Sequence, residues 1–158
     1  MKEFDTKGIV QLVTFSLGTE EFSIDILKVQ EIIRPMDITR VPGAPGFIEG
    51  VINLRGKVIP VMDLRKRLGM PPQEETRDTR IVVVEVGGKT VGLKVDSVSE
   101  VLRLPTDRIE PPPTFDSVQD TDCIQGVGKL EDRLIILLDV EKVLGPEERS
   151  TLDAMFQT

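Results

Sequence analysis

The sequence predicts an all-β protein made of two copies of one five-stranded unit, each curled into a small, strongly bent barrel with a short helix. Two observations lead to this class. Apolar and polar residues alternate in short runs that are separated by turn residues, which is typical of β-strands. The same order of runs occurs twice along the 158 residues, and such a repeat indicates a duplicated structural unit. So few strands have to curl to cover a core.

The repeat can be followed residue by residue in two blocks. In the first block, the residues that recur in the same order and spacing are Val29, Glu31 and Ile32, matched by Val98, Glu100 and Val101. In the second block they are Ile48, Gly50, Val51, Leu54, Val58 and Ile59, matched by Ile124, Gly126, Val127, Leu130, Leu134 and Ile135. Order, spacing and residue type agree, so we expect both copies to adopt one fold.

Each copy has the same order of predicted elements. A first strand at 9–17, or at 80–86 in the second copy, leads through a glycine-containing turn into a second strand, as in a β-hairpin. A third strand follows at 29–34, or at 98–104. A proline-rich loop and a second hairpin of two strands complete the five.

Short helices are predicted after the second hairpin of each copy and at the end of the chain. Asp63 and Asp139 each precede a short periodic run that ends at glycine, which indicates an N-capped helix of one or two turns. The predicted bounds are 8–70 for the first copy, 79–146 for the second, 8–146 for the whole domain and 147–158 for a short C-terminal helix.

The composition excludes several classes of function. The chain has no His, Trp or Tyr and a single cysteine, Cys123. It therefore has no imidazole base, no histidine metal ligand and no thiolate cage, and we expect neither a metal nor a cofactor. One cysteine suits a reducing compartment. The net charge of −7 argues against binding to nucleic acid. Without a signal peptide or a long apolar run, we expect a cytoplasmic protein that does not insert into the membrane.

Two motifs approach known enzyme signatures without matching them. The stretch from Gly50 to Lys57 has five residues between its glycines, and Val58 stands where a phosphate loop needs Ser or Thr. Asp63 and Asp139 resemble the two carboxylates of aspartic proteases, but neither is followed by the small hydroxyl residue and glycine of that site. Helix capping explains both aspartates. A hydrolase using this pair and a generic ligand-binding barrel are the alternatives that remain.

Several motifs resemble the CheW family of chemotaxis coupling proteins. They are 25–32 (DILKVQEI), 50–56 (GVINLRG), 58–64 (VIPVMDL) and 95–102 (VDSVSEVL), and the resemblance runs over residues 10–144. It implies two SH3-like β-barrel subdomains and no enzymatic activity. It also implies a scaffold that ties the histidine kinase CheA, through its regulatory domain, to the cytoplasmic tips of methyl-accepting chemoreceptors in arrays at the inner face of the membrane.

The differences between the copies indicate where a function of the chain's own lies. Arg55 stands at a hairpin tip, where exposure is expected, and its counterpart is Glu131, of opposite charge. Arg55 also matches the family's prominent arginine. We expect Arg55 and Glu31 to form a charge pair that presents a binding surface. The second copy cannot form this pair because both of its members are acidic.

The residues predicted to bind partners are Val29, Glu31, Gly50, Arg55, Val98 and Val101. Gly50 recurs as Gly126, which favours backbone geometry as the reason for this glycine. The three valines either pack in the core or line an apolar groove between the barrels. Such a groove would suit an amphipathic helix at a receptor tip.

Overall fold

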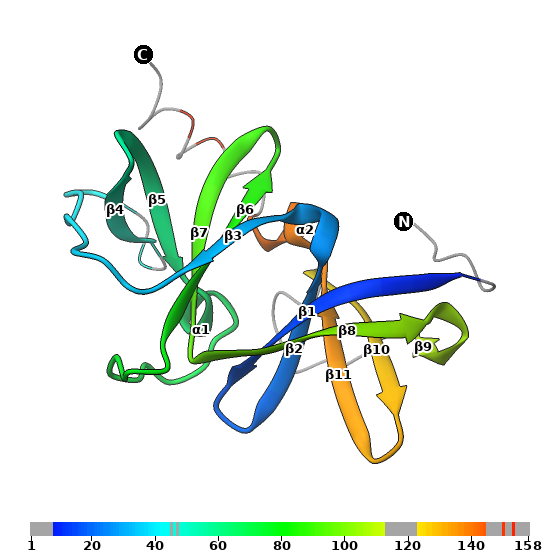
Figure 1. Cartoon of the computed structure of the whole chain (residues 1–158). Coiled ribbons are helices and arrows are strands. Elements are labelled where there is room, and N and C mark those ends of the chain that lie inside the picture. The colour runs from blue at the N-terminus through cyan, green and yellow to red at the C-terminus, as the bar shows by residue number, and fades with distance from the viewer. Residues whose placement is uncertain are drawn as a thin grey trace.

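The computed structural model describes residues 8–44, 46, 48–112, 123–144, 150 and 153, which form two β-sheets side by side (Figure 1). The six-stranded sheet has the order β8 (Ser97–Pro105), β1 (Ile9–Leu17), β2 (Glu20–Asp25), β11 (Arg133–Leu138), β10 (Ile124–Leu130) and β9 (Ile109–Glu110). The five-stranded sheet has the order β3 (Val29–Ile33), β6 (Arg80–Val86), β7 (Lys89–Val95), β5 (Lys57–Asp63) and β4 (Ile48–Leu54). The short helices are η1 (Ile26–Lys28), α1 (Leu64–Arg67), η2 (Thr106–Arg108) and α2 (Val140–Val143). The prediction of a mostly β fold with short helices is confirmed.

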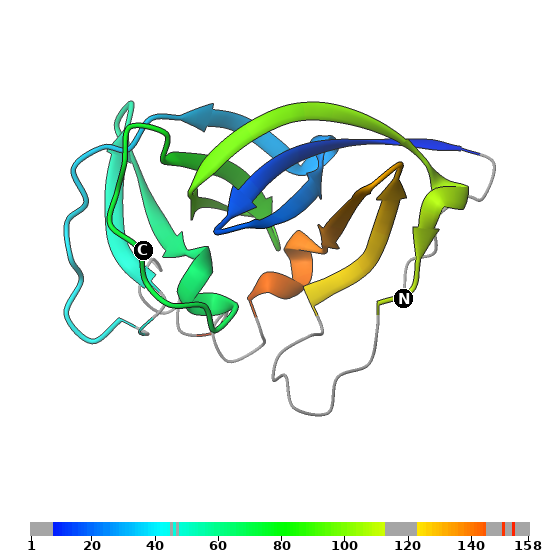
Figure 2. The ribbon, with the colours of Figure 1, turned by 90° about the horizontal axis from the view of Figure 1, so that it is seen from below.

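Each sheet mixes strands from both copies of the repeat. β1 and β2 of the first copy lie between β8 and β11 of the second, while β6 and β7 of the second lie between β3 and β5 of the first. Figure 2 shows the long, curved ladder that β1 forms with β8. The expectation that each copy closes a barrel by itself is therefore wrong. Alternation along a strand specifies its faces and leaves the copy with which it pairs undetermined.

The chain continues from one edge of each sheet to the other edge. β8 leads through η2 into β9, which pairs with β10 at the far edge. In the five-stranded sheet, Thr39 returns to β4 and forms two backbone hydrogen bonds of 2.8 Å with Val51. Glycine stands at both closures: a Cβ on Gly50 would lie 2.2 Å from the carbonyl oxygen of Thr39, and one on Gly126 would lie 2.8 Å from that of Glu110.

Among the described residues, three buried clusters make up the core. One lies within the five-stranded sheet and consists of Ile52, Leu54, Ile59, Val61, Ile81 and Val83; another lies within the six-stranded sheet and consists of Leu12, Leu104 and Leu137. The largest cluster lies between the sheets and includes Phe15, Ile24, Val82, Val84 and Leu93. Successive residues of β6 thus face different clusters, which explains its unbroken apolar run. Because side chains fill both sheet interiors, the arrangement argues against a ligand-binding barrel.

The helical turns after β5 and β11 begin at the predicted aspartates. The Asp63 carboxylate accepts a hydrogen bond of 3.0 Å from the backbone N–H of Arg65, and the Asp139 carboxylate accepts one of 3.0 Å from that of Glu141. The predicted N-caps are confirmed, and they account for both carboxylates that a hydrolase would need.

The C-terminal helix predicted at 147–158 falls largely outside the described residues, of which this part holds only Ser150 and Asp153. No helix in the described part of the chain is both long enough and apolar enough to span a bilayer.

Candidate partner-binding site

Arg55 is presented by a tight turn between β4 and β5. Arg55 and Gly56 are the two turn residues, with φ values of 53° and 86°, and Leu54 pairs with Lys57 across the hairpin. Two successive residues with positive φ are typical of a type I′ turn. The Asn53 side chain accepts a hydrogen bond of 2.8 Å from the Gly56 N–H, which holds the turn in place. The Arg55 side chain is 69% exposed at this tip.

The guanidinium of Arg55 binds the carboxylate of Glu31 on the edge strand β3. Arg55 Nη2 donates a hydrogen bond to Glu31 Oε2, so the predicted charge pair is confirmed. This hydrogen bond raises the pKa of the Arg55 guanidinium above its ordinary value. Exposed ion pairs contribute little to folding stability because water and salt screen them. This pair is therefore expected to contribute little as a structural link.

The residue that matches Arg55 in the second copy has nearly the same φ and the opposite charge. Glu131 has a φ of 54° in the β10–β11 turn, which matches the 53° of Arg55. Glu100, the counterpart of Glu31, faces Arg133 across 3.7 Å, and Arg133 also binds Glu21 at 2.5 Å. One tip thus carries an arginine paired to β3, while the other carries, at a matching φ, an acid for which the described residues show no ion pair.

A pocket of ≈ 310 Å³ opens to solvent beside the Arg55–Glu31 pair. It is lined by Gln30, Glu31, Leu54, Arg55, Lys57, Ile59, Val83 and Thr90. Leu54, Ile59 and Val83 are buried and give it an apolar floor, and Lys57 Nζ donates a hydrogen bond of 3.1 Å to Thr90 Oγ1 at its rim. An apolar centre with a polar rim is the usual composition of a protein–protein interface, and this pocket has both on a small scale.

The three predicted valines have different environments. Val29 on β3 and Val98 on β8 are partly buried and pack against the large cluster between the sheets. Val101 on β8 is 55% exposed. Its counterpart on β3, Ile32, is 41% exposed and adjoins Glu31. Ile32 is not among the residues predicted from the sequence, although its match to Val101 in the repeat would have indicated it. The apolar groove stays a prediction.

Gly50 is buried at the closure of the five-stranded sheet and presents no side chain to solvent. Its contact with the Thr39 backbone explains why glycine is needed there. Any contribution of Gly50 to binding therefore passes through the shape of β4 and the tip that follows it.

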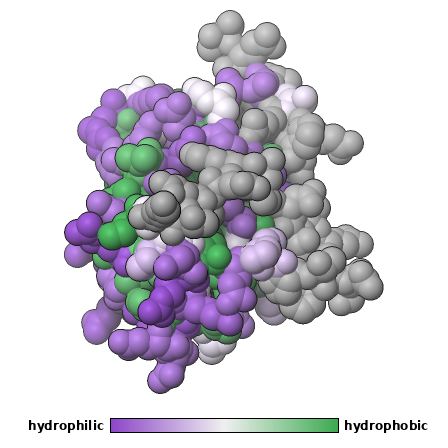
Figure 3. All heavy atoms as spheres, turned by 90° about the vertical axis from the view of Figure 1, so that its right-hand side faces the viewer, coloured by the Kyte–Doolittle hydropathy of each residue, from purple (hydrophilic) through white to green (hydrophobic). Residues whose placement is uncertain are grey.

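Large apolar side chains are exposed at Ile9, Leu27, Ile32, Met36, Val58, Val101 and Leu134. Two of the pairs among them, Ile32 with Val101 and Val58 with Leu134, occupy matching positions of the repeat. Figure 3 shows one face of the molecule, on which hydrophobic residues lie in small groups among hydrophilic ones. Scattered apolar groups of this kind are normal on a soluble domain, so the charged tip is the more distinctive feature.

Within the described ranges, no group of three or more His, Cys, Asp or Glu side chains is placed to hold a metal ion. Cys123 is fully buried. The aspartates that a hydrolase would use cap helices. The described surface combines an exposed ion pair with an open pocket beside it, which suits contact with another protein, so the class that it fits is a binding protein.

Comparison with known proteins agrees with this class and names the family. The CheW-like domain family matches residues 11–148, and the chain belongs to the CheW family. The chemotaxis protein CheW of Klebsiella aerogenes is 41% identical over 143 residues, which cover 90% of this chain and 86% of that protein. The chemotaxis protein CheW of Bacillus subtilis is 40% identical over 139 residues, which cover 87% and 88% respectively.

A solved structure shows the same fold. The crystal structure of the scaffolding protein TtCheW from Thermoanaerobacter tengcongensis superposes with a TM-score of 0.82 at 40% sequence identity, and the match covers 89% of this chain and 96% of that one. The chain is thus a chemotaxis scaffolding, or coupling, protein of a non-catalytic family.

Proposed function

We propose that this chain is an adaptor that couples the cytoplasmic tips of methyl-accepting chemoreceptors to the histidine kinase CheA, which it contacts through the regulatory domain of the kinase. It acts in the cytoplasm, within receptor arrays at the inner face of the membrane. Membership of a family of chemotaxis scaffolding proteins supports this proposal.

The observation that carries the proposal is the exposed Arg55–Glu31 pair at the tip of the β4–β5 hairpin. Charges at the rim of an interface set orientation and partner choice more than they set raw affinity. A guanidinium held by a neighbouring carboxylate points in one direction, which suits a partner with an acidic group at a fixed position. The opposite charge at Glu131 makes the two tips different to such a partner.

The apolar part of the proposed surface lies on β3 and β8. Ile32 and Val101 are exposed there, and Val29 and Val98 on the same strands are partly buried against the core. An amphipathic helix binds through apolar side chains spaced along one of its faces. A receptor tip with such a face would contact these strands, while Arg55 would fix its orientation.

The finer description of the fold belongs to the same proposal. We interpret each sheet as an SH3-like barrel that closes at Gly50 or at Gly126, where a carbonyl oxygen comes too near to allow a side chain. The two barrels form one domain at 8–146, and the helix predicted at 147–158 follows it.

A matched pair of substitutions tests the proposal. Arg55→Glu and Glu131→Arg reverse the charge at two matching positions whose φ values are nearly the same, 53° and 54°, so each variant keeps a non-glycine residue at a positive φ. Binding to CheA and to a soluble receptor tip is measured for each variant by calorimetry, together with the melting temperature. We expect Arg55→Glu to weaken binding and Glu131→Arg to retain it, with both variants melting close to the parent. Equal binding by the two variants would contradict the assignment of the site.

A further inference from the structure

In the described residues the chain passes between the two sheets at two places. It leaves β2 and reaches β3 through η1, and it leaves β7 and reaches β8 through the single residue Asp96. These crossings occupy matching positions of the repeat. The β3 and β8 strands that begin there carry the exposed Ile32 and Val101.

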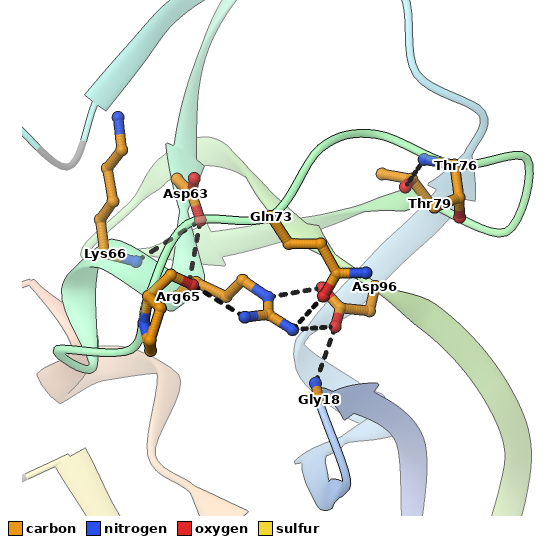
Figure 4. A network of polar contacts seen from close by, with 9 residues as sticks. Gly18, Asp63, Arg65, Lys66, Gln73, Thr76, Thr79 and Asp96 are labelled. Carbon is orange, nitrogen blue, oxygen red and sulfur yellow. Dashed lines mark hydrogen bonds and ion pairs between the residues drawn. The ribbon is translucent and has the colours of Figure 1, made fainter.

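The second crossing is held by Arg65, which lies on α1 in the five-stranded half of the molecule. Arg65 Nε donates a hydrogen bond of 2.9 Å to Asp96 Oδ1, and Nη2 donates one of 2.5 Å to Asp96 Oδ2. The same carboxylate accepts a hydrogen bond of 2.7 Å from the N–H of Gly18, in the β1–β2 turn of the other sheet. Figure 4 shows the Arg65 side chain extended toward Asp96, with Gly18 below Asp96 and joined to the same carboxylate.

Arg65 also fixes the segment that joins the two copies. Its Nη1 donates a hydrogen bond of 2.8 Å to the carbonyl oxygen of Pro71, and its Nη2 bonds to the side chain of Gln73. One guanidinium thus links α1, the connecting segment, the crossing and, through Asp96, the hairpin of the opposite sheet. A planar guanidinium with several fixed donors suits this role better than an ammonium group does.

The first crossing has a related clamp of reversed polarity. Glu141, on α2, occupies the position in the repeat that Arg65 occupies on α1. Its carboxylate accepts a hydrogen bond of 3.3 Å from Lys28 Nζ in η1 and one of 3.0 Å from the N–H of Gly87, in the β6–β7 turn. Gly87 is the counterpart of Gly18, so in both clamps a carboxylate holds the turn of the opposite hairpin.

The two clamps differ in burial. The side chains of Arg65 and Asp96 are 10% and 21% exposed, whereas those of Lys28 and Glu141 are 44% and 37% exposed. Water competes less for the buried clamp, and its bidentate geometry fixes direction as well as distance. The exposed clamp has a longer ion-pair contact, 3.3 Å between Lys28 Nζ and Glu141 Oε2, and is more strongly screened.

We propose that the two clamps set the angle between the sheets, with Arg65 as the dominant positioning residue, and that they thereby place β8 relative to β3 for the partner. The part of this inference that concerns the partner rests on the proposed function. The part that concerns the angle between the sheets stands on the geometry of the crossings alone.

Two isosteric substitutions test the clamps. Asp96→Asn removes the charge and leaves an amide N–H facing an Arg65 or Gly18 donor, because an amide has one acceptor oxygen in place of two. Glu141→Gln makes the same change at the exposed clamp. Spin labels at Gln11→Cys on β1 and Glu85→Cys on β6, both exposed positions, report the distance between the sheets by pulsed electron resonance. The parent chain without added cysteines checks that buried Cys123 does not take up label.

We expect Asp96→Asn to broaden or shift the distance distribution and Glu141→Gln to change it less. Binding of Asp96→Asn to the partners should fall by between about 2-fold and 30-fold. If Asp96→Asn does not fold, Arg65→Lys gives the same comparison, because it keeps the charge and loses the bidentate contact. The inference is overturned if the distance distribution of the variant used for the buried clamp, Asp96→Asn or Arg65→Lys, is the same as that of the parent. It is also overturned if that variant and Glu141→Gln change the distribution equally. If the parent chain binds neither partner, the proposed function fails while the distances still decide the role of the clamps.

Discussion

Replacing Gly50 with alanine tests how the five-stranded sheet closes. The new Cβ would lie 2.2 Å from the carbonyl oxygen of Thr39, a distance that real Cβ contacts do not reach. The backbone at this point has to separate by about 1 Å, since overpacked atoms relieve a clash only by moving. That movement stretches the two 2.8 Å hydrogen bonds between Thr39 and Val51 beyond their useful range.

The expected loss of stability follows from these contacts. Overpacking costs about 1–3 kcal/mol, and each weakened backbone hydrogen bond costs up to about 1 kcal/mol. Because Thr39 is exposed, water replaces part of what the hydrogen bonds lose. We therefore expect a loss of about 3 kcal/mol, which lowers the melting temperature of a chain of this length by roughly 6–12 °C.

The assay is thermal unfolding followed by circular dichroism, with two control variants. Gly126→Ala has its nearest contact at 2.8 Å and should cost less, while the added Cβ of Gly46→Ala has no atom of the described residues within 4 Å and should cost least. Partner binding measured well below the melting transition separates a change in stability from a lost contact. If Gly50→Ala melts at the same temperature as Gly46→Ala but binds partners poorly, Gly50 acts at the binding surface. That result would refute its role in closing the sheet.

Two further predictions concern β8 and the crossing before it. Val101→Ser should weaken binding to a receptor tip and leave the melting temperature almost unchanged, because Val101 is exposed. Val98→Ser should lower the free energy of unfolding by about 1 kcal/mol or more, because Val98 packs against the core. Unfolding curves in which Val101→Ser loses more stability than Val98→Ser would contradict this prediction. The hydrogen bond from Arg65 lowers the pKa of the Asp96 carboxyl below its ordinary value, with help from the Gly18 N–H and Lys94. A lowered folded-state pKa stabilises the fold above the pKa of the unfolded chain, and that stability is lost as the pH falls through the folded-state value. The unfolding free energies of the parent and of Asp96→Asn are measured in urea over a range of pH. The difference between them should be largest at neutral pH and shrink below about pH 4, the ordinary range of an aspartate. A difference that does not depend on pH would exclude the charge as its cause.

Much of the fold could be predicted because alternation and turns are local signals. The strands expected at 9–17 and 80–86 are β1 and β6 with the same bounds. The exchange of hairpins between the copies could not be predicted. The β1–β2 hairpin has the same apolar pattern as the β6–β7 hairpin, so each one suits either sheet, and only contacts distant in sequence decide between them.

Some contacts of the charged residues could likewise be predicted from the sequence, and others could not. The Arg55–Glu31 pair could be predicted because Arg55 differs from Glu131 at a position that hairpin geometry exposes. The Arg65–Asp96 clamp was missed, although Arg65 differs from Glu141 by charge in the same manner. Its partner Asp96 matches Leu27 in the repeat, so comparison of the copies gave no sign of an ion pair there. That contact depends on how the chain crosses between the sheets, which the pattern of residues does not specify.

The most direct test of the coupling function is the autophosphorylation rate of CheA in a reconstituted mixture with a soluble receptor tip. The rate is measured with the parent chain, with Arg55→Glu, with Glu131→Arg and with no added chain. The proposed function predicts that the parent and Glu131→Arg raise the rate above that of kinase and receptor tip alone, and that Arg55→Glu raises it much less. A rate that the parent chain leaves unchanged, at concentrations where a complex would form, would contradict the proposal.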